Sequence, residues 1–243
     1  MNIKKFLLTK IRLSSYFWIF FAIFLLLSFA LPSYNFNSGT LTLFSVNSFL
    51  YGFYISPILA AQKSRIEELH KILRAEANSL FSLVLHLKKL PKELRNHLQS
   101  LVTDYLNAKL AGRNPNSGEQ EYEKLITYCL EYTGDNQVDI DKSLDSLVAN
   151  QQNRTNFSMQ VASRVYANEW HIMAILFSIT LGFILALNIG TSALLIIVRA
   201  LLCTGLTMLV LILIKLSTLS HKKAKQMWEP LNKLITTNFY RID

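Results

Sequence analysis

The fold is decided by residues 13–62, LSSYFWIFFAIFLLLSFALPSYNFNSGTLTLFSVNSFLYGFYISPILAAQ, which contain no Asp, Glu, Lys or Arg. A helix needs about 20 mainly apolar residues to cross a bilayer. The stretch is long enough for two such spans, from Leu13 to Leu31 and from about Leu41 to Ala61. Because the linker between them is short and uncharged, we expect the two spans to form a helical hairpin.

A second hairpin is expected near the C-terminus, where Trp170 to Ile189 and Ala193 to Leu216 are also apolar. The three residues between these spans are Gly190, Thr191 and Ser192, which are typical of a turn. Only 17% of the chain is charged, whereas soluble domains carry about a quarter. This composition argues against a soluble enzyme, a disordered chain and a nucleic-acid-binding module.

The first span could instead be a cleaved signal peptide, with Lys4 to Arg12 as its basic region. Its apolar run is longer than the 7–15 residues typical of signal peptides. The exit Phe29-Ala30-Leu31-Pro32 also lacks a cleavage site with small residues. We therefore favour a membrane span.

The net charge of +9 is concentrated beside the apolar segments. Residues 1–12 and the tail from Lys215 each carry an excess of basic residues, and a further basic group follows the second span: Lys63, Arg65, Lys71 and Arg74. Lys and Arg accumulate on the cytoplasmic side of membrane proteins. The pattern predicts a multi-pass protein of the plasma (inner) membrane with both termini and the middle region cytoplasmic, and no nucleic-acid partner.

The polar middle of the chain is predicted to be helical. Apolar residues recur at helical spacing after the second span, so that span is expected to continue out of the membrane as one helix. Further helices are expected between Pro91 and Gly112, over Glu121 to Tyr132, and from Asp139 without a break into the third span.

The predicted fold class is an all-α membrane protein. It has four transmembrane helices in two hairpins, with a cytoplasmic helical bundle between the second and third. The predicted divisions are 1–61 for the first hairpin, 62–168 for the cytoplasmic insert, 169–216 for the second hairpin and 217–243 for a cytoplasmic tail.

The second span carries an unusual number of polar residues. The candidate pore-lining residues are Ser45, Phe49, Gly52, Phe53 and Ser56. Such a face could line a water-filled pore with an aromatic constriction that gates by dewetting. The alternative is a helix-packing face, because Ser and Gly let membrane helices approach closely, and composition alone favours packing.

Arg199 is the only full charge in the interior of a predicted span, since Lys215 stands at the very end of the fourth. It lies six residues, or roughly 9 Å, beyond Ala193 at the start of the apolar segment. An intramembrane Arg is costly and often marks an ion path, and an inward-facing Arg199 would favour anions. The alternative is that Arg199 extends to the outer head groups or pairs with a carbonyl near the Gly190 loop.

The sequence offers no catalytic set, so we predict that the protein is not an enzyme and uses no cofactor or metal. The five histidines show no metal-ligand spacing, and no phosphate loop or nucleophile motif is present. Cys129 and Cys203 lie in segments of different polarity, and we expect no disulfide between them.

Residues 48–54, Ser-Phe-Leu-Tyr-Gly-Phe-Tyr, resemble the pore-helix segment Ser-Phe-x-x-Gly-Phe-Tyr of the bestrophin anion channels. The layout of two hairpins, a helical insert and a tail with Trp228-Glu229-Pro230 that ends near Tyr240-Arg241 resembles the bestrophin-like family. The resemblance implies a pentamer around a central pore, with Phe49 and Phe53 at two apolar neck positions.

This sequence departs from bestrophins at three points. Ser45 stands at the third neck position, where bestrophins carry a bulky apolar residue, which argues against a tight neck. Ala60-Ala61-Gln62-Lys63 replaces the Arg-Trp-Trp run that follows the motif. The acidic calcium clasp of the animal proteins has no counterpart, so calcium gating is not implied.

Two functional hypotheses follow. The first is a homo-oligomeric anion (chloride) channel whose second span lines the pore. The alternative is a non-conducting, membrane-anchored helical module that binds a cytoplasmic protein partner, because residues 62–168 are long for a connector. Both place the chain in the lipid bilayer.

Overall fold

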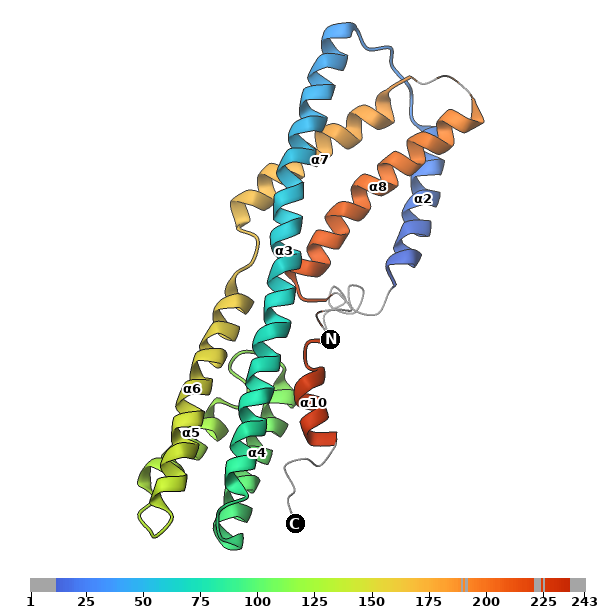
Figure 1. Ribbon diagram of the computed structural model, residues 1–243. Coiled ribbons are helices and arrows are strands. Elements are labelled where there is room, and N and C mark those ends of the chain that lie inside the picture. The colour runs from blue at the N-terminus through green and yellow to red at the C-terminus, as the bar shows by residue number, and fades with distance from the viewer. Residues whose placement is uncertain (1–11, 189, 191, 221–223, 225, 237–243) are drawn as a thin grey trace. The chain divides into compact units, whose positions relative to one another are not determined.

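The computed structural model describes residues 12–188, 190, 192–220, 224 and 226–236 (Figure 1). The helices are α2 (Leu13–Ala30), α3 (Ser38–Leu87), α4 (Lys92–Gly112), α5 (Glu119–Glu131), α6 (Gln137–Ala162), α7 (Ala167–Ala186), α8 (Ala193–Ser217) and α10 (Glu229–Thr236). Within these described residues, β structure is limited to one isolated bridge between Tyr34 and Leu187. The predicted all-α class is confirmed.

Four helical stretches of the described chain are long and apolar enough to cross a membrane. They are Leu13–Ala30, Ser38–Leu87, Gln137–Ala186 (which contains α6 and α7) and Ala193–Ser217. Their apolar parts coincide with the four predicted spans. Most of the basic region Lys4 to Arg12, on which the signal-peptide alternative depends, lies outside the described residues, which begin at Arg12. The terminal pair Tyr240-Arg241 also lies outside them.

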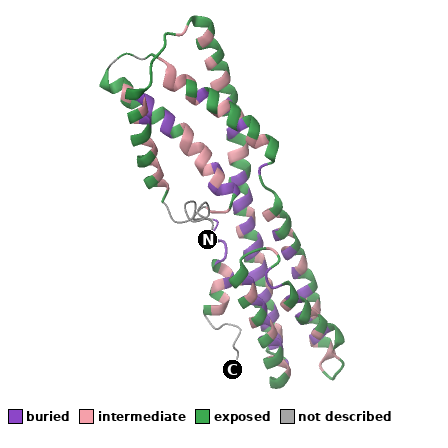
Figure 2. Cartoon of the chain, turned by 180° about the vertical axis from the view of Figure 1, so that it is seen from behind, coloured by how far each residue is buried: buried purple, intermediate pink, exposed green. Residues whose placement is uncertain are grey.

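The chain divides into two compact units. Met1–Ser64 and Arg164–His221 form one, and Arg65–Ser163 and Lys222–Asp243 form the other. We call them the apolar unit and the polar unit. Exposed and half-buried residues dominate the helices of the apolar unit, whereas buried residues recur along those of the polar unit (Figure 2).

The apolar unit is held together by two clusters of apolar side chains. In the first, Phe24 of α2 packs against Ala200 and Cys203 of α8. The second joins α3, α7 and α8, and its most buried members include Tyr51 and Leu213. Within a bilayer such clusters hold helices together by van der Waals packing, because lipid chains are as apolar as the side chains and leave no hydrophobic driving force between helices.

The two short loops of the apolar unit pair with each other. The backbone N–H of Tyr34 donates to the carbonyl of Ala186 at 2.8 Å, and the N–H of Asn188 donates to the carbonyl of Tyr34 at 3.0 Å. The side chain of Asn188 also donates to Oδ1 of Asn35 at 3.0 Å. These bonds tie the α2–α3 connection to the end of α7.

The polar unit has a core of its own, built from the second half of α3 with α4, α5 and α6. Its fully buried apolar side chains include Leu69, Leu73, Leu80, Leu98, Leu106, Leu125 and Ile140. In the tail, Trp228 is buried and meets Phe157 edge to face, with the ring centroids 5.5 Å apart. The segment that contains Trp228-Glu229-Pro230 therefore docks on the helices of this unit.

The prediction that the second span continues as one helix is confirmed, because α3 is unbroken from Ser38 to Leu87. The prediction of an unbroken helix from Asp139 into the third span is wrong, since α6 ends at Ala162. Arg65 donates through Nε to the carbonyl of Gln160 at 2.7 Å and through Nη2 to that of Val161 at 2.8 Å. Carbonyls in a last helical turn lack partners within the helix, so Arg65 stabilises the end of α6.

Candidate functional site

One face of α3 is exposed in the apolar unit and carries all five candidate pore-lining residues: Ser45, Phe49, Gly52, Phe53 and Ser56. Phe49 and Phe53 are 70% and 71% exposed, and their rings stack with centroids 6.1 Å apart. A Cβ added at Gly52 would meet no described atom within 4 Å. Among the described residues, this face therefore contributes little to packing within the chain.

The opposite face of α3 makes the contacts within the chain. Tyr51 and Ile55 are buried there, at 2% and 3% exposure. Asn47 donates through Nδ2 to Oγ1 of Thr180 at 2.8 Å and to the carbonyl of Leu176 at 3.2 Å. Ser45 and Ser56, on the other face, are exposed among the described residues.

Arg199 is buried and holds the end of α7. Its guanidinium donates to the carbonyl of Leu187 through Nη2, and through Nη1 to that of Leu185 at 3.5 Å. Terminal carbonyls lack partners within their helix and form the negative end of its dipole. This is the carbonyl pairing weighed for Arg199 from the sequence, at the helix end that precedes the Gly190 loop.

A cavity of about 510 Å³ lies beside Arg199 within the apolar unit. Its lining is mostly apolar, with polar side chains from three helices: Ser45, Ser48 and Tyr51 of α3, Thr180 of α7 and Arg199 of α8. The volume falls within the range of about 300–1,000 Å³ that is usual for ligand sites. Ser45 belongs both to this cavity and to the exposed face of α3.

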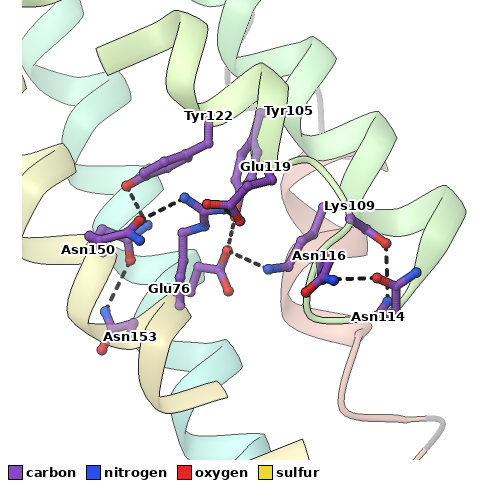
Figure 3. A network of polar contacts seen from close by, with 12 residues as sticks. Glu76, Tyr105, Lys109, Asn114, Asn116, Glu119, Tyr122, Asn150 and Asn153 are labelled. Carbon is purple, nitrogen blue, oxygen red and sulfur yellow. Dashed lines mark hydrogen bonds and ion pairs between the residues drawn. The ribbon is translucent and has the colours of Figure 1, made fainter. Parts of the chain in front are cut away.

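The polar unit contains a buried network of charged and aromatic side chains that our sequence analysis missed (Figure 3). Glu76 of α3 and Lys109 of α4 are fully buried, with Nζ 3.6 Å from Oε1. The hydroxyl of Tyr105 donates to the same Oε1. Two side chains of α4 thus meet on one carboxylate of α3.

Arg154 of α6 joins the network from the other side. It pairs with Glu119 of α5, and its guanidinium lies 3.9 Å from the ring centroid of Tyr122. The hydroxyl of Tyr122 donates to the carbonyl of Leu147 at 2.8 Å and accepts from Nδ2 of Asn150 at 3.1 Å. Arg154 is buried while Glu119 is 56% exposed, so the two buried basic groups of the network pair with one buried and one exposed carboxylate.

Burial governs protonation in this network. It raises the pKa of Tyr105 well above its usual value, and the negative charge of Glu76 raises it further. Burial raises the pKa of Tyr122 to about 12. Burial lowers the pKa of Lys109, while Glu76 opposes that shift. Both tyrosines therefore remain protonated hydrogen-bond donors at neutral pH.

A signal for the network is present in the sequence. Glu76 follows Leu69 and Leu73 at helical spacing, and Lys109 follows Val102 and Tyr105 in the same way. A charged residue that falls on the apolar face of a helix is buried together with that face, and a buried charge needs a partner. The charges that interrupt these stripes therefore mark the position of the network in the sequence.

Comparison with known protein families identifies the family of this chain. The sequence pattern of the Bestrophin-like domain matches residues 15–221. The chain belongs to the bestrophin-like family. The resemblance inferred from residues 48–54 and from the layout is thereby confirmed. Comparisons with curated proteins and with solved structures give no match for the chain.

The family match covers helices of both units of this bestrophin-like chain, from α2 to α8. Its Ser-Phe-x-x-Gly-Phe-Tyr segment lies wholly within α3. The helix separates the residues of that segment by face, since Phe49, Gly52 and Phe53 are exposed while Tyr51 is buried.

Proposed function

We propose that this bestrophin-like chain is one subunit of an oligomeric anion channel in the plasma (inner) membrane, with chloride as its ion. The exposed face of α3 lines a central pore formed by a ring of copies. Identical subunits that meet through head-to-tail contacts close into a ring around such an axis. The family resemblance favours five copies.

The observation that carries this proposal is the division of α3 into two faces. Tyr51 and Ile55 pack into the chain, whereas Ser45, Gly52 and Ser56 point away from it. Hydroxyl groups gain nothing from contact with lipid chains, where no water is present to bond them. A polar face that the subunit leaves uncovered is best accommodated against water or against the same face of further copies.

Phe49 and Phe53 would form the constriction of the pore. They lie one helical turn apart, stacked and exposed. A ring of five such pairs would narrow the path and could close it by dewetting. Ser45, one turn before Phe49, would widen the path where bestrophins carry a bulky apolar residue.

The proposed orientation places both termini and the polar unit in the cytoplasm. The basic residues that follow the second span are the evidence, since the connections between the paired spans carry neither Lys nor Arg. The bias of basic residues toward the cytoplasm sets topology when it is counted over short loops near the spans.

A non-conducting anchor is the second candidate, and the compactness of the polar unit favours it. That unit has its own buried core and a charge network that a simple connector would not need. Under this proposal a cytoplasmic protein binds the polar unit, and the apolar unit only holds it at the membrane.

Chloride flux from proteoliposomes tests the channel. The natural chain is compared with Phe49→Ala/Phe53→Ala, and the matched control is Leu43→Ala/Leu50→Ala, which shortens two exposed side chains elsewhere on α3. We expect flux from the natural chain, faster or less selective flux from the Phe variant, and no change in the control.

Oligomer mass in detergent completes the test. A pentamer with flux that responds to Phe49 and Phe53 supports the channel. A folded monomer, shown by helicity and sharp elution, that gives no flux in any variant would reject the channel and leave the anchored module.

A further inference from the structure

Three buried polar atoms of the cavity beside Arg199 have no hydrogen-bond partner among the described residues. They are Oγ of Ser48, Oη of Tyr51 and Nε of Arg199, and all three residues line the cavity. Ser48 and Tyr51 are three residues apart in α3, so they lie on one side of the helix. Unsatisfied buried polar atoms are rare in native proteins, and each calls for a partner.

Arg199 also lacks a counter-charge in its own unit. The ranges 1–64 and 164–220 contain a single acidic residue, Glu169. Glu169 belongs to the first turn of α7, whereas Arg199 binds the last turn. The intervening 18 residues correspond to roughly 27 Å of helix. Arg199, which is 5% exposed, therefore has carbonyl dipoles but no anion beside it, and buried ions are normally paired.

The three atoms define the chemistry of the missing partner. The Nε–H group of Arg199 can only donate, and both hydroxyls can donate as well. A group with negative charge and several acceptor oxygens, such as a carboxylate, would satisfy all three. Apart from Ser45 and Thr180, the remaining lining is apolar, with Ile184, Leu195, Val198, Leu202 and Leu206 among its members.

The size of the cavity restricts the rest of the ligand. At about 30 Å³ for each water-sized group, 510 Å³ holds about 17 groups. That is one acyl chain with a small head, and too little for both chains of a phospholipid. A free chloride or acetate ion would leave most of the apolar volume empty.

We propose that this cavity binds a single-chain lipid of the fatty-acid type. Its carboxylate lies against Arg199, Ser48 and Tyr51. Its acyl chain lies along the apolar lining from α7 and α8. The proposal is independent of conduction, because the cavity lies within one subunit and binding can be measured without flux.

Equilibrium binding of radiolabelled palmitate to the purified, delipidated full chain in detergent tests the proposal. We expect saturable binding of one palmitate per chain. Tyr51→Phe and Ser48→Ala should each weaken binding by about 2- to 10-fold, the range for loss of one hydrogen bond. Arg199→Met should weaken it by at least about 10-fold, since a charged partner is lost.

Tyr51→Phe and Ser48→Ala are the decisive variants. Arg199→Met is less informative, because Arg199 also holds the end of α7 and its replacement could unfold the chain. Neither hydroxyl bonds another described group, so both variants should melt no earlier than the natural chain when palmitate is absent. Tyr54→Phe is the matched control, since Tyr54 is a half-buried tyrosine of the same helix outside the cavity lining.

Four results would overturn the proposal. The first is palmitate binding that is equal in the natural chain, Tyr51→Phe, Ser48→Ala and Tyr54→Phe. The second is displacement by chloride or acetate at equal concentration, which would indicate a site for soluble anions. The third is preference for phosphatidylglycerol over palmitate. The fourth is binding to dissociated monomers but not to the intact assembly, which would mean that a neighbouring copy fills the cavity.

Discussion

Lys109 and Glu76 form an ion pair with no exposure to solvent, with Nζ 3.6 Å from Oε1. Replacing one partner leaves the other charge buried and uncompensated. We expect Lys109→Met or Glu76→Gln to lower the free energy of unfolding of the polar unit by about 3–5 kcal/mol. Loss of helicity in denaturant, followed by circular dichroism of the protein in detergent, measures the change.

The double variant Lys109→Met/Glu76→Gln should lose less than the sum of the two single variants, because it leaves neither charge unpaired. Glu68→Gln is the matched control, since Glu68 and Lys71 are also 3.6 Å apart but exposed. That change should cost less than about 1 kcal/mol. Equal costs for the buried and exposed pairs would contradict the proposed importance of the network.

Cys129 is predicted to react slowly with thiol reagents. Burial raises the pKa of its thiol to about 11, whereas a free cysteine titrates near 8.5. At pH 8 only about one thiol in a thousand would be thiolate, the form that reacts. Iodoacetamide labelling in a Cys203→Ala background should be slow at pH 8 and should accelerate as pH rises toward 11.

The same shift predicts how pH affects stability. A pKa raised by folding means that the folded protein holds its proton longer than the unfolded chain. The contribution of Cys129 is therefore complete below about pH 8.5 and is lost as pH rises toward 11. In the labelling experiment, Leu130→Cys in a Cys129→Ala/Cys203→Ala background is the control, because Leu130 is 67% exposed. Equally fast labelling of the two positions at pH 8 would show that Cys129 is accessible.

Asn47 links α3 to α7 through its bonds to Thr180 and to the carbonyl of Leu176. Polar side-chain bonds between membrane helices contribute about 0.6 kcal/mol on average and up to about 1.7 kcal/mol. Asn47→Ala should lower the thermal stability of the protein in detergent by an amount in this range.

Thr42→Val is the control for Asn47→Ala. Thr42 is exposed, and its hydroxyl bonds the carbonyl of Ser38 within the same helix. Its loss should leave the melting temperature nearly unchanged. An equal shift in both variants would mean that the bond between α3 and α7 adds nothing to stability.

The sequence was most informative where a pattern is local. The charge-free run 13–62 predicts two spans because length and composition alone decide whether a helix can cross a bilayer. The apolar spacing after residue 62 predicts that α3 continues, since the helical period is unbroken. The family motif at 48–54 needed only adjacent residues.

The sequence was least informative where partners are distant along the chain. The end of α6 depends on Arg65, which lies 95 residues before Gln160, and no local pattern reveals that contact. Likewise, the sequence left several alternatives open for Arg199, and the structure identifies the carbonyls of Leu185 and Leu187 as its partners. Contacts of this kind are set by how helices pack, which helical periodicity does not specify.

Cysteine accessibility along α3 offers a direct test of which side of its exposed surface faces water. In a background with Cys129→Ala and Cys203→Ala, single cysteines are placed at Ser45, Gly52 and Ser56 and, as controls, at Leu43 and Leu50. All five positions are exposed in one subunit. Leu43 and Leu50, however, lie on a different, apolar side of the helix from Ser45, Gly52 and Ser56.

A charged, membrane-impermeant thiol reagent reacts only with cysteines that contact water, because the thiolate is the reactive form. In a water-filled pore the three cysteines at Ser45, Gly52 and Ser56 should react at least about 10-fold faster than those at Leu43 and Leu50. When the reagent is added from one side of the membrane only, the cysteines at Ser45 and Ser56 should react at different rates. The one that lies beyond Phe49 and Phe53 should react more slowly, since the two rings would restrict passage of the reagent. Uniformly slow labelling at all five positions would place the whole surface in lipid or in a dry contact between copies, and the pore-lining role of α3 would be rejected.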